Sequence, residues 1–71
     1  MDATKIREHM KVVGSDGQHV GIVDGIEGDR IKLTKNDPAA GGQHRYVGLN
    51  DVEQIKDGKV CLNSQAQARS M

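Results

Sequence analysis

Aromatic side chains are almost missing from this sequence. Tyr46 is the only one, and there is no Trp and no Phe. Proteins that bind single-stranded nucleic acid without reading its sequence stack the bases on aromatic rings, so recognition by stacking is disfavoured. The same shortage means that the hydrophobic core has to be built from Val, Ile, Leu and Met.

Net charge and paired cysteines are missing too. Ten Lys and Arg residues balance ten Asp and Glu residues, which removes the chain-wide electrostatic case for nucleic acid. Cys61 is the only cysteine, so a disulfide within the chain is excluded and a reducing cytosol fits best. No apolar run is long enough for a signal peptide or a membrane span. We therefore expect a cytoplasmic protein that does not span a membrane.

The chain is also short. Its 71 residues make one domain at most. A single core of this size seldom supplies more than about 3–5 kcal/mol of net stability. We therefore expect either modest stability or a homodimer.

What the sequence does contain is a pattern of short strands and tight turns, clearest over residues 12–35. Asp16-Gly17 lies between two apolar runs, and Asp-Gly is a strong hairpin signal because Gly adopts positive φ at little cost. Gly28-Asp29 repeats the signal one strand later. The stretch therefore predicts three strands joined by two turns, and the rest of the fold is expected to complete this meander.

The middle and third strands of the meander differ in regularity. Gly21 and Gly25 interrupt the middle strand, and glycines inside a strand indicate a bulge or a sharp bend. Residues 30–34 alternate cleanly, which predicts that Ile31 and Leu33 face the core.

The remaining segments predict a loop, two more strands and a short turn. Residues 36–44 form the longest irregular stretch, and residues 45–49 read as a fourth strand. Residues 50–53 predict one short helical turn, residues 59–63 a closing strand, and residues 64–71 a flexible polar tail.

Individual side chains in this second half carry specific expectations. Asn50 is expected to cap the helical turn, with Glu53 reaching back to it. In the closing strand, Val60 and Leu62 should face inward and Cys61 outward. The whole pattern predicts an all-β, SH3-like small barrel of five to six short antiparallel strands, formed by residues 1–63.

Three runs carry a resemblance to a known family: VVGSDGQHVGIVD, GDRIKL and LNDVEQIKDGKVCL. Together they resemble the photosynthetic-reaction-centre barrel (PRC-barrel) domains. Over residues 3–63, including KLTKNDPAAGGQH, the chain is most similar to short single-domain bacterial proteins of uncharacterised function. PRC-barrel relatives include the cytoplasmic part of a reaction-centre subunit and the C-terminal domain of a ribosome-maturation factor, and both dock onto other macromolecules. The resemblance therefore implies an adaptor, and it supplies no catalytic residue.

Few side chains form a pattern that carries chemistry. The three histidines, His9, His19 and His44, lack the short spacing of a metal motif, so no metal site is expected. The acidic residues fall mostly in turns, where Asp bonds its own backbone. Cys61 has no His nearby in the sequence, and no phosphate-binding loop is present. We expect no catalytic residue and no cofactor.

A basic strand face is the strongest functional candidate. Arg30 and Lys32 should point outward from one strand, with further cations near them. The predicted interaction face consists of Arg30, Lys32, Lys35, Arg45 and His44. A solvated face without function is the simplest interpretation, and an anionic partner is the alternative.

Three functions remain open. The first is a non-enzymatic binding or adaptor module that docks onto a protein, which includes a homodimer formed through an exposed strand edge. The second is an RNA- or ribosome-associated barrel that uses Arg30, Lys32 and Arg45. The third, an enzyme or small-ligand carrier, would need an inward polar cluster that the alternation does not show.

Overall fold

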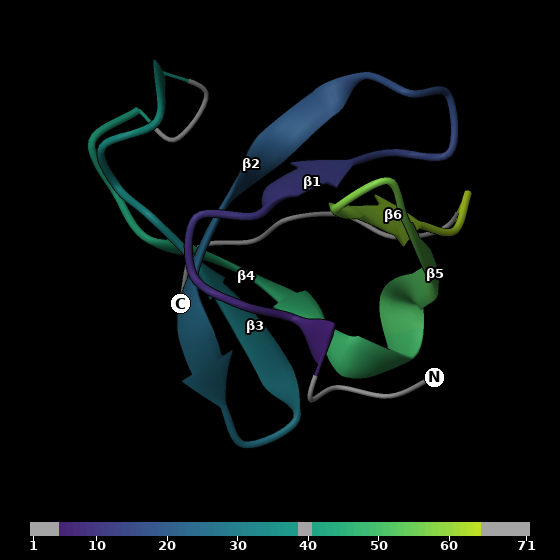
Figure 1. Ribbon diagram of the computed structural model, residues 1–71. Coiled ribbons are helices and arrows are strands. Elements are labelled where there is room, and N and C mark those ends of the chain that lie inside the picture. The colour runs from purple at the N-terminus through teal and green to yellow at the C-terminus, as the bar shows by residue number, and fades with distance from the viewer. Residues whose placement is uncertain (1–4, 39–40, 65–71) are drawn as a thin grey trace.

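A computed structural model of the chain describes residues 5–38 and 41–64 (Figure 1). Six strands form one sheet, which confirms the all-β prediction. In chain order they are β1 (Lys11–Val13), β2 (His19–Glu27), β3 (Arg30–Leu33), β4 (Arg45–Gly48), β5 (Val52–Lys56) and β6 (Lys59–Leu62). The spatial order is β4-β3-β2-β1-β6-β5. No helix formed by the described residues is long and apolar enough to cross a membrane.

The predicted meander is present. β1, β2, β3 and β4 pair in succession, each antiparallel to the next. Gly17 and Gly28 adopt positive φ in the two turns, at 82° and 61°. The Asp16 carboxylate accepts a hydrogen bond from the backbone N–H of Gln18 at 3.0 Å, so the first turn is fixed by its own side chain.

β2 bends at the two places where glycines interrupt it. Its register with β1 skips Val20, which is next to Gly21. Its register with β3 skips Asp24, which is next to Gly25. Two bulges in a nine-residue strand increase its bend and twist. β2 can therefore pair with β1 along its first part and with β3 along its second part.

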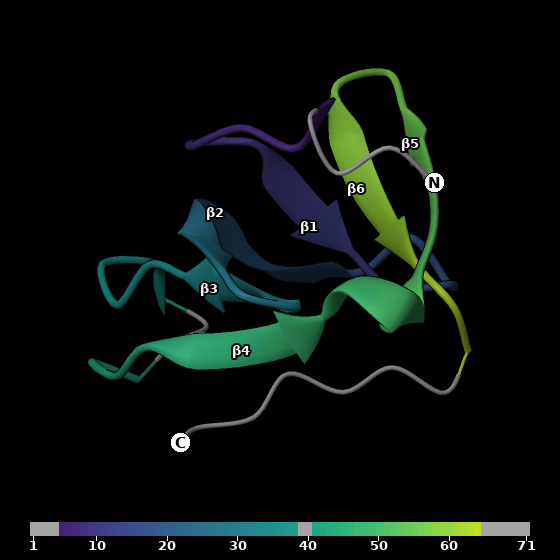
Figure 2. The same cartoon turned by 90° about the horizontal axis from the view of Figure 1, so that it is seen from below.

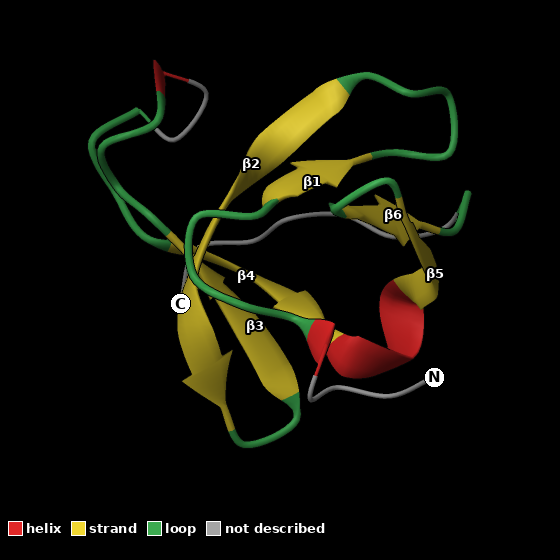
Figure 3. Cartoon of the chain, in the orientation of Figure 1, coloured by secondary structure: helices red, strands yellow, loops and turns green. Residues whose placement is uncertain are grey.

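Two details of the predicted barrel are wrong. The strands are not all antiparallel, because β1 and β6 run parallel to each other. The sheet is also not closed: within residues 5–38 and 41–64, β4 and β5 are its two edges and no ladder joins them. The reason lies in the connection between these edges, where the chain forms a 3₁₀ turn, η3 (Leu49–Asp51), in place of strand pairing (Figures 2 and 3).

The 3₁₀ turn is close to the predicted helical turn but is built differently. It ends at Asp51, so Val52 and Glu53 already belong to β5. Its N-cap is Gly48, with no side-chain cap, so the expected capping by Asn50 is wrong. Backbone hydrogen bonds hold the turn instead: the Leu49 N–H donates to the Asp29 carbonyl, and the Asn63 N–H donates to the Asp51 carbonyl, each at 2.9 Å.

Nine buried side chains form the core, and all of them are Val, Ile or Leu: Ile6, Val12, Val23, Ile31, Leu33, Val47, Val52, Val60 and Leu62. The inward orientation predicted for Ile31, Leu33, Val60 and Leu62 is confirmed. Cys61 is half-buried. Of the predicted tail, residues 65–71 lie outside the described residues, as do residues 39–40 of the predicted loop.

Candidate interaction surface

The register between β3 and β4 decides which cations share a face. Lys32 lies opposite Tyr46, and Leu33 lies opposite Arg45. Directly opposed residues point to the same side of a sheet. Arg30 and Lys32 therefore share the outer face, whereas Arg45 points to the inner face together with the buried Leu33. Arg45 is on the neighbouring strand, as expected, but not on the expected face.

The two outward cations of β3 have partners within the protein. The Lys32 ammonium lies 3.3 Å from the Glu27 carboxylate. This hydrogen bond raises the pKa of Lys32 above its usual value of 10.5, and the smaller effect of desolvation opposes it. The Arg30 guanidinium lies 5.1 Å from the centre of the Tyr46 ring, a cation–π distance. Both charges are thus already engaged on the outer face.

Arg45 connects strands that are not neighbours. Its terminal N–H donates to the backbone carbonyl of Val20 on β2, although β3 lies between β2 and β4. Its Nε is buried and has no hydrogen-bond partner among the described residues. The side chain passes over Gly21, where a Cβ atom would lie 3.3 Å from the guanidinium. Arg45 therefore acts as a structural brace across the inner face.

The last two members of the predicted face also lie apart from Arg30 and Lys32. His44 is half-buried, and its Nδ1 lies 2.9 Å from the Leu33 carbonyl, so that nitrogen carries the proton and donates. Lys35 is exposed just beyond the end of β3. The five predicted residues are therefore spread over both faces and a loop.

The histidines occupy three separate environments. The His19 Nε2 lies 2.9 Å from the carboxylate of Asp37, whose side chain is only 7% exposed. His9 is exposed with φ at 72°, and its backbone N–H donates to the Val23 carbonyl. Among the residues that the structure places, no three His, Cys, Asp or Glu side chains gather in a way that could hold a metal ion.

Pairing between β1, β6 and β5 assembles a different group of cations, which we call the lysine row. Lys11 on β1 lies opposite Lys59 on β6, and Lys59 lies opposite Lys56 on β5. All three side chains are exposed. Because neighbouring strands are about 4.8 Å apart, the row spans about 10 Å across the outer face.

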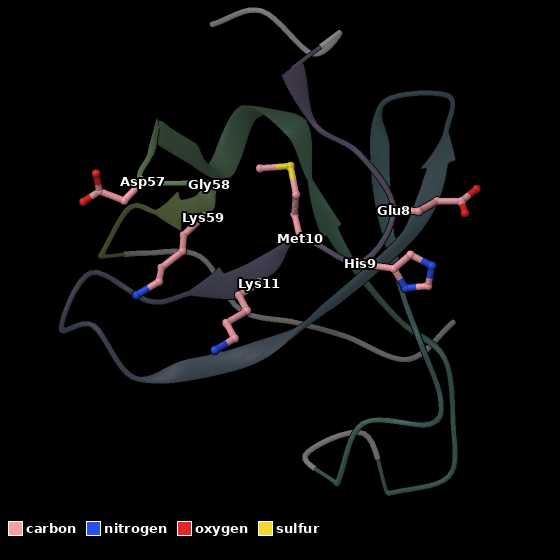
Figure 4. Close-up of a pocket in the computed structure, with 7 residues that line it drawn as sticks. All are labelled: Glu8, His9, Met10, Lys11, Asp57, Gly58 and Lys59. Carbon is pink, nitrogen blue, oxygen red and sulfur yellow. The ribbon is translucent and has the colours of Figure 1, made fainter.

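A shallow groove of about 390 Å³ lies beside this row (Figure 4). Lys11 and Lys59 line it, and their ammonium groups extend to the same side of the ribbon. Glu8 and Asp57 also line the groove, but their carboxylates point away from the two lysines. In the described parts of the chain, no carboxylate lies within 4.0 Å of the Lys11, Lys56 or Lys59 ammonium.

Sequence reasoning missed the lysine row because Lys11 and Lys59 come from opposite ends of the chain. The pairing of Lys56 with Lys59 could be predicted from the sequence, because Asp57-Gly58 predicts a hairpin and a two-residue hairpin places these lysines opposite each other. The parallel pairing of β1 with β6 has no local signal, since no turn connects the two strands.

The fold and this surface together define a small all-β domain with an aliphatic core. Its lysines lie on the outside, and Arg45 braces the inner face. The model of the bacterial family DUF2171, described as uncharacterized proteins conserved in bacteria, matches residues 6–69, so the chain belongs to this family. The match agrees with the expected resemblance to short bacterial proteins of uncharacterised function. No curated protein and no solved structure matches the chain.

Proposed function

We propose that the protein is a non-enzymatic binding module whose partner is another protein. The observation that carries this proposal is the outer face of β1, β5 and β6. It presents exposed lysines that form no ion pair with another described residue, next to the half-buried Val13 on β1 and Ile22 on the adjacent strand β2. A polar rim beside a more apolar centre is a feature of protein-docking surfaces.

The surroundings of the candidate nucleophile support a role without catalysis. Cys61 lies between Val13 on β1 and Gln54 on β5, as the strand register shows. Neither of these cross-strand neighbours is a base that can remove the thiol proton. Among the described residues, the buried side chains are all aliphatic, and Arg45 reaches across the inner face to the Val20 carbonyl.

The resemblance to PRC-barrel domains supports the same proposal by analogy, since those relatives dock onto other macromolecules. A cytoplasmic location is part of the proposal, because a single unpaired thiol fits a reducing compartment. RNA binding through Arg30, Lys32 and Arg45 gains no support, because Arg45 lies on the opposite face from the other two and each of the three has a partner inside the protein.

A second copy of the chain is one form that the protein partner could take. Among the described residues, β4 and β5 each pair on one side only, so their other sides offer backbone N–H and C=O groups for strand addition. Sedimentation equilibrium over a hundredfold range of concentration separates this form from a different partner. A mass of one chain throughout excludes the homodimer.

Affinity capture tests the general proposal. The immobilised full chain is incubated with bacterial lysate, with and without nuclease, and bound material is compared with that on a column carrying an unrelated domain of equal charge. We expect the same protein to be retained with and without nuclease. Retention that disappears with nuclease assigns the partner to nucleic acid and overturns the proposal, as does the absence of specific retention.

A further inference from the structure

We propose that the lysine row of Lys11, Lys59 and Lys56 binds an acidic segment of a partner protein. The inference rests on the proposed function and deepens it, because it names the surface and the chemistry that recognises the partner. The three lysines are consecutive across three neighbouring strands and are all exposed. Three like charges on neighbouring strands, which lie about 5 Å apart, attract a partner with clustered charges of opposite sign.

Lys32 on β3 differs from the lysines of the row, because it has a carboxylate partner within the protein. Lys32 is also on an outer face, and Glu27 lies 3.3 Å from it on the next strand. The row has no such carboxylate in the described parts of the chain, even though Glu8 and Asp57 are close enough to line the same groove. Their side chains point away from Lys11 and Lys59 (Figure 4). The row therefore remains available to a carboxylate from outside.

The surface next to the row suits a peptide chain. Along the strands, the adjacent outward positions are Val13 on β1 and Cys61 on β6, and both are half-buried. An extended peptide carries side chains of one face about 6.6–6.8 Å apart. Acidic residues at alternate positions of such a peptide can each reach a flexible lysine, and the residues between them point away from the sheet.

Nucleic acid suits this surface less well. Proteins that bind single strands combine cations with stacked aromatic rings. The only Phe, Tyr or Trp of the chain, Tyr46, is on β4, at the opposite edge of the sheet from β5, and the Arg30 guanidinium lies over its ring. The row itself offers charge without a stacking surface, which favours carboxylates over bases.

The experiment measures binding of a fluorescein-labelled peptide of five Glu-Ser repeats by fluorescence anisotropy at low ionic strength. The variant K11Q/K56Q/K59Q removes the three charges and replaces each lysine with a polar side chain that is one atom shorter. The matched control K5Q/R7Q/K35Q removes three exposed cations outside the row. Far-UV circular dichroism and a thermal melt verify that each variant is folded.

We expect the row variant to bind about tenfold more weakly than the wild type, since three exposed ion pairs of ordinary strength are lost. We expect the control to stay within about twofold of the wild type. The inference is overturned if both variants weaken equally, or if no peptide binds. It is also overturned if a labelled RNA strand of equal charge binds the wild type more tightly than the peptide does.

These results are separable from a failure of the proposed function. If the captured protein is retained equally by the wild type and by K11Q/K56Q/K59Q, the module binds through another surface and only the present inference fails. If nothing is retained but the peptide binds through the row, the chemistry of the row stands and the proposed cellular role fails.

Discussion

Replacing Gly21 by alanine tests how closely the sheet is packed at its bend. A Cβ atom at this position would lie 2.9 Å from Cδ1 of Leu33 and 3.3 Å from the terminal nitrogen of Arg45. Leu33 is fully buried, so its methyl group has little room to move away. Forcing one methyl group into a packed core costs about 1–3 kcal/mol. A domain of this size has about 3–5 kcal/mol to lose, so Gly21→Ala should be marginally folded.

Gly25→Ala is the matched control, because Gly25 is on the same strand but has open space around it. A Cβ atom there meets nothing within 4 Å, and the residue does not have positive φ. Alanine restricts the unfolded chain more than glycine does, so we expect unchanged stability or a gain of about 0.4–1 kcal/mol. The two substitutions remove the same flexibility and differ only in what the new methyl group meets.

Urea unfolding followed by far-UV circular dichroism measures both effects, since the chain has no Trp. We expect the midpoint of Gly21→Ala to fall well below that of Gly25→Ala. The double variant Gly21→Ala/Leu33→Val should lose less stability than the sum of the two single variants, because shortening Leu33 makes room for the methyl group. Equal midpoints for the two alanine variants would refute the close contact between β2 and β3.

Three further predictions concern polar contacts. Glu27→Gln removes the partner that raises the pKa of Lys32. The stability advantage of the wild type over this variant should be fully present below the unfolded Lys32 pKa of 10.5 and should fall as pH rises through the higher folded value. Urea midpoints of both proteins at about pH 8 and about pH 11 measure this difference. Asp37→Ala frees the His19 ring from its carboxylate, so amide hydrogen exchange of residues 34–37 should accelerate, and unchanged exchange would mean that the pair does not hold the loop. Arg45→Ala should lower the free energy of unfolding by about 1–3 kcal/mol, because it removes a hydrogen bond and packing. Arg45→Met should lower it less, because methionine keeps the apolar stem and removes the unpartnered Nε. Equal losses of stability in the two variants would contradict the role of Arg45 as a structural brace.

Much of this fold could be predicted because its signals are local. The turns at Gly17 and Gly28 depend on residues that are adjacent in the chain, and the alternation around Ile31 depends on the two-residue period of a strand. Even the inner position of Arg45 was readable, since the alternation that places Val47 inside also places Arg45 on that face.

The parts that could not be predicted depend on contacts between distant segments. The parallel pair joins Lys11 to Lys59, which are 59 − 11 = 48 positions apart, and no residue between them specifies that meeting. The choice between a closed barrel and an open sheet depends on η3, which is held by hydrogen bonds to the Asp29 carbonyl and from the Asn63 N–H, and both residues are distant from it in the chain. The lysine row depends on the same parallel pairing of β1 with β6, so the sequence alone could not predict it.

The place of β1 between β2 and β6 has a consequence for the order of folding. A ribosome makes β1 before any other strand, yet one of its two neighbours is made last. Until β6 emerges, the hairpin of β1 and β2 exposes a bare backbone edge to the crowded surroundings of the nascent chain. Pairing between segments that are far apart in the sequence slows folding. The pairing of β6 with β1 is therefore a late step, and it completes the sheet after the meander has formed.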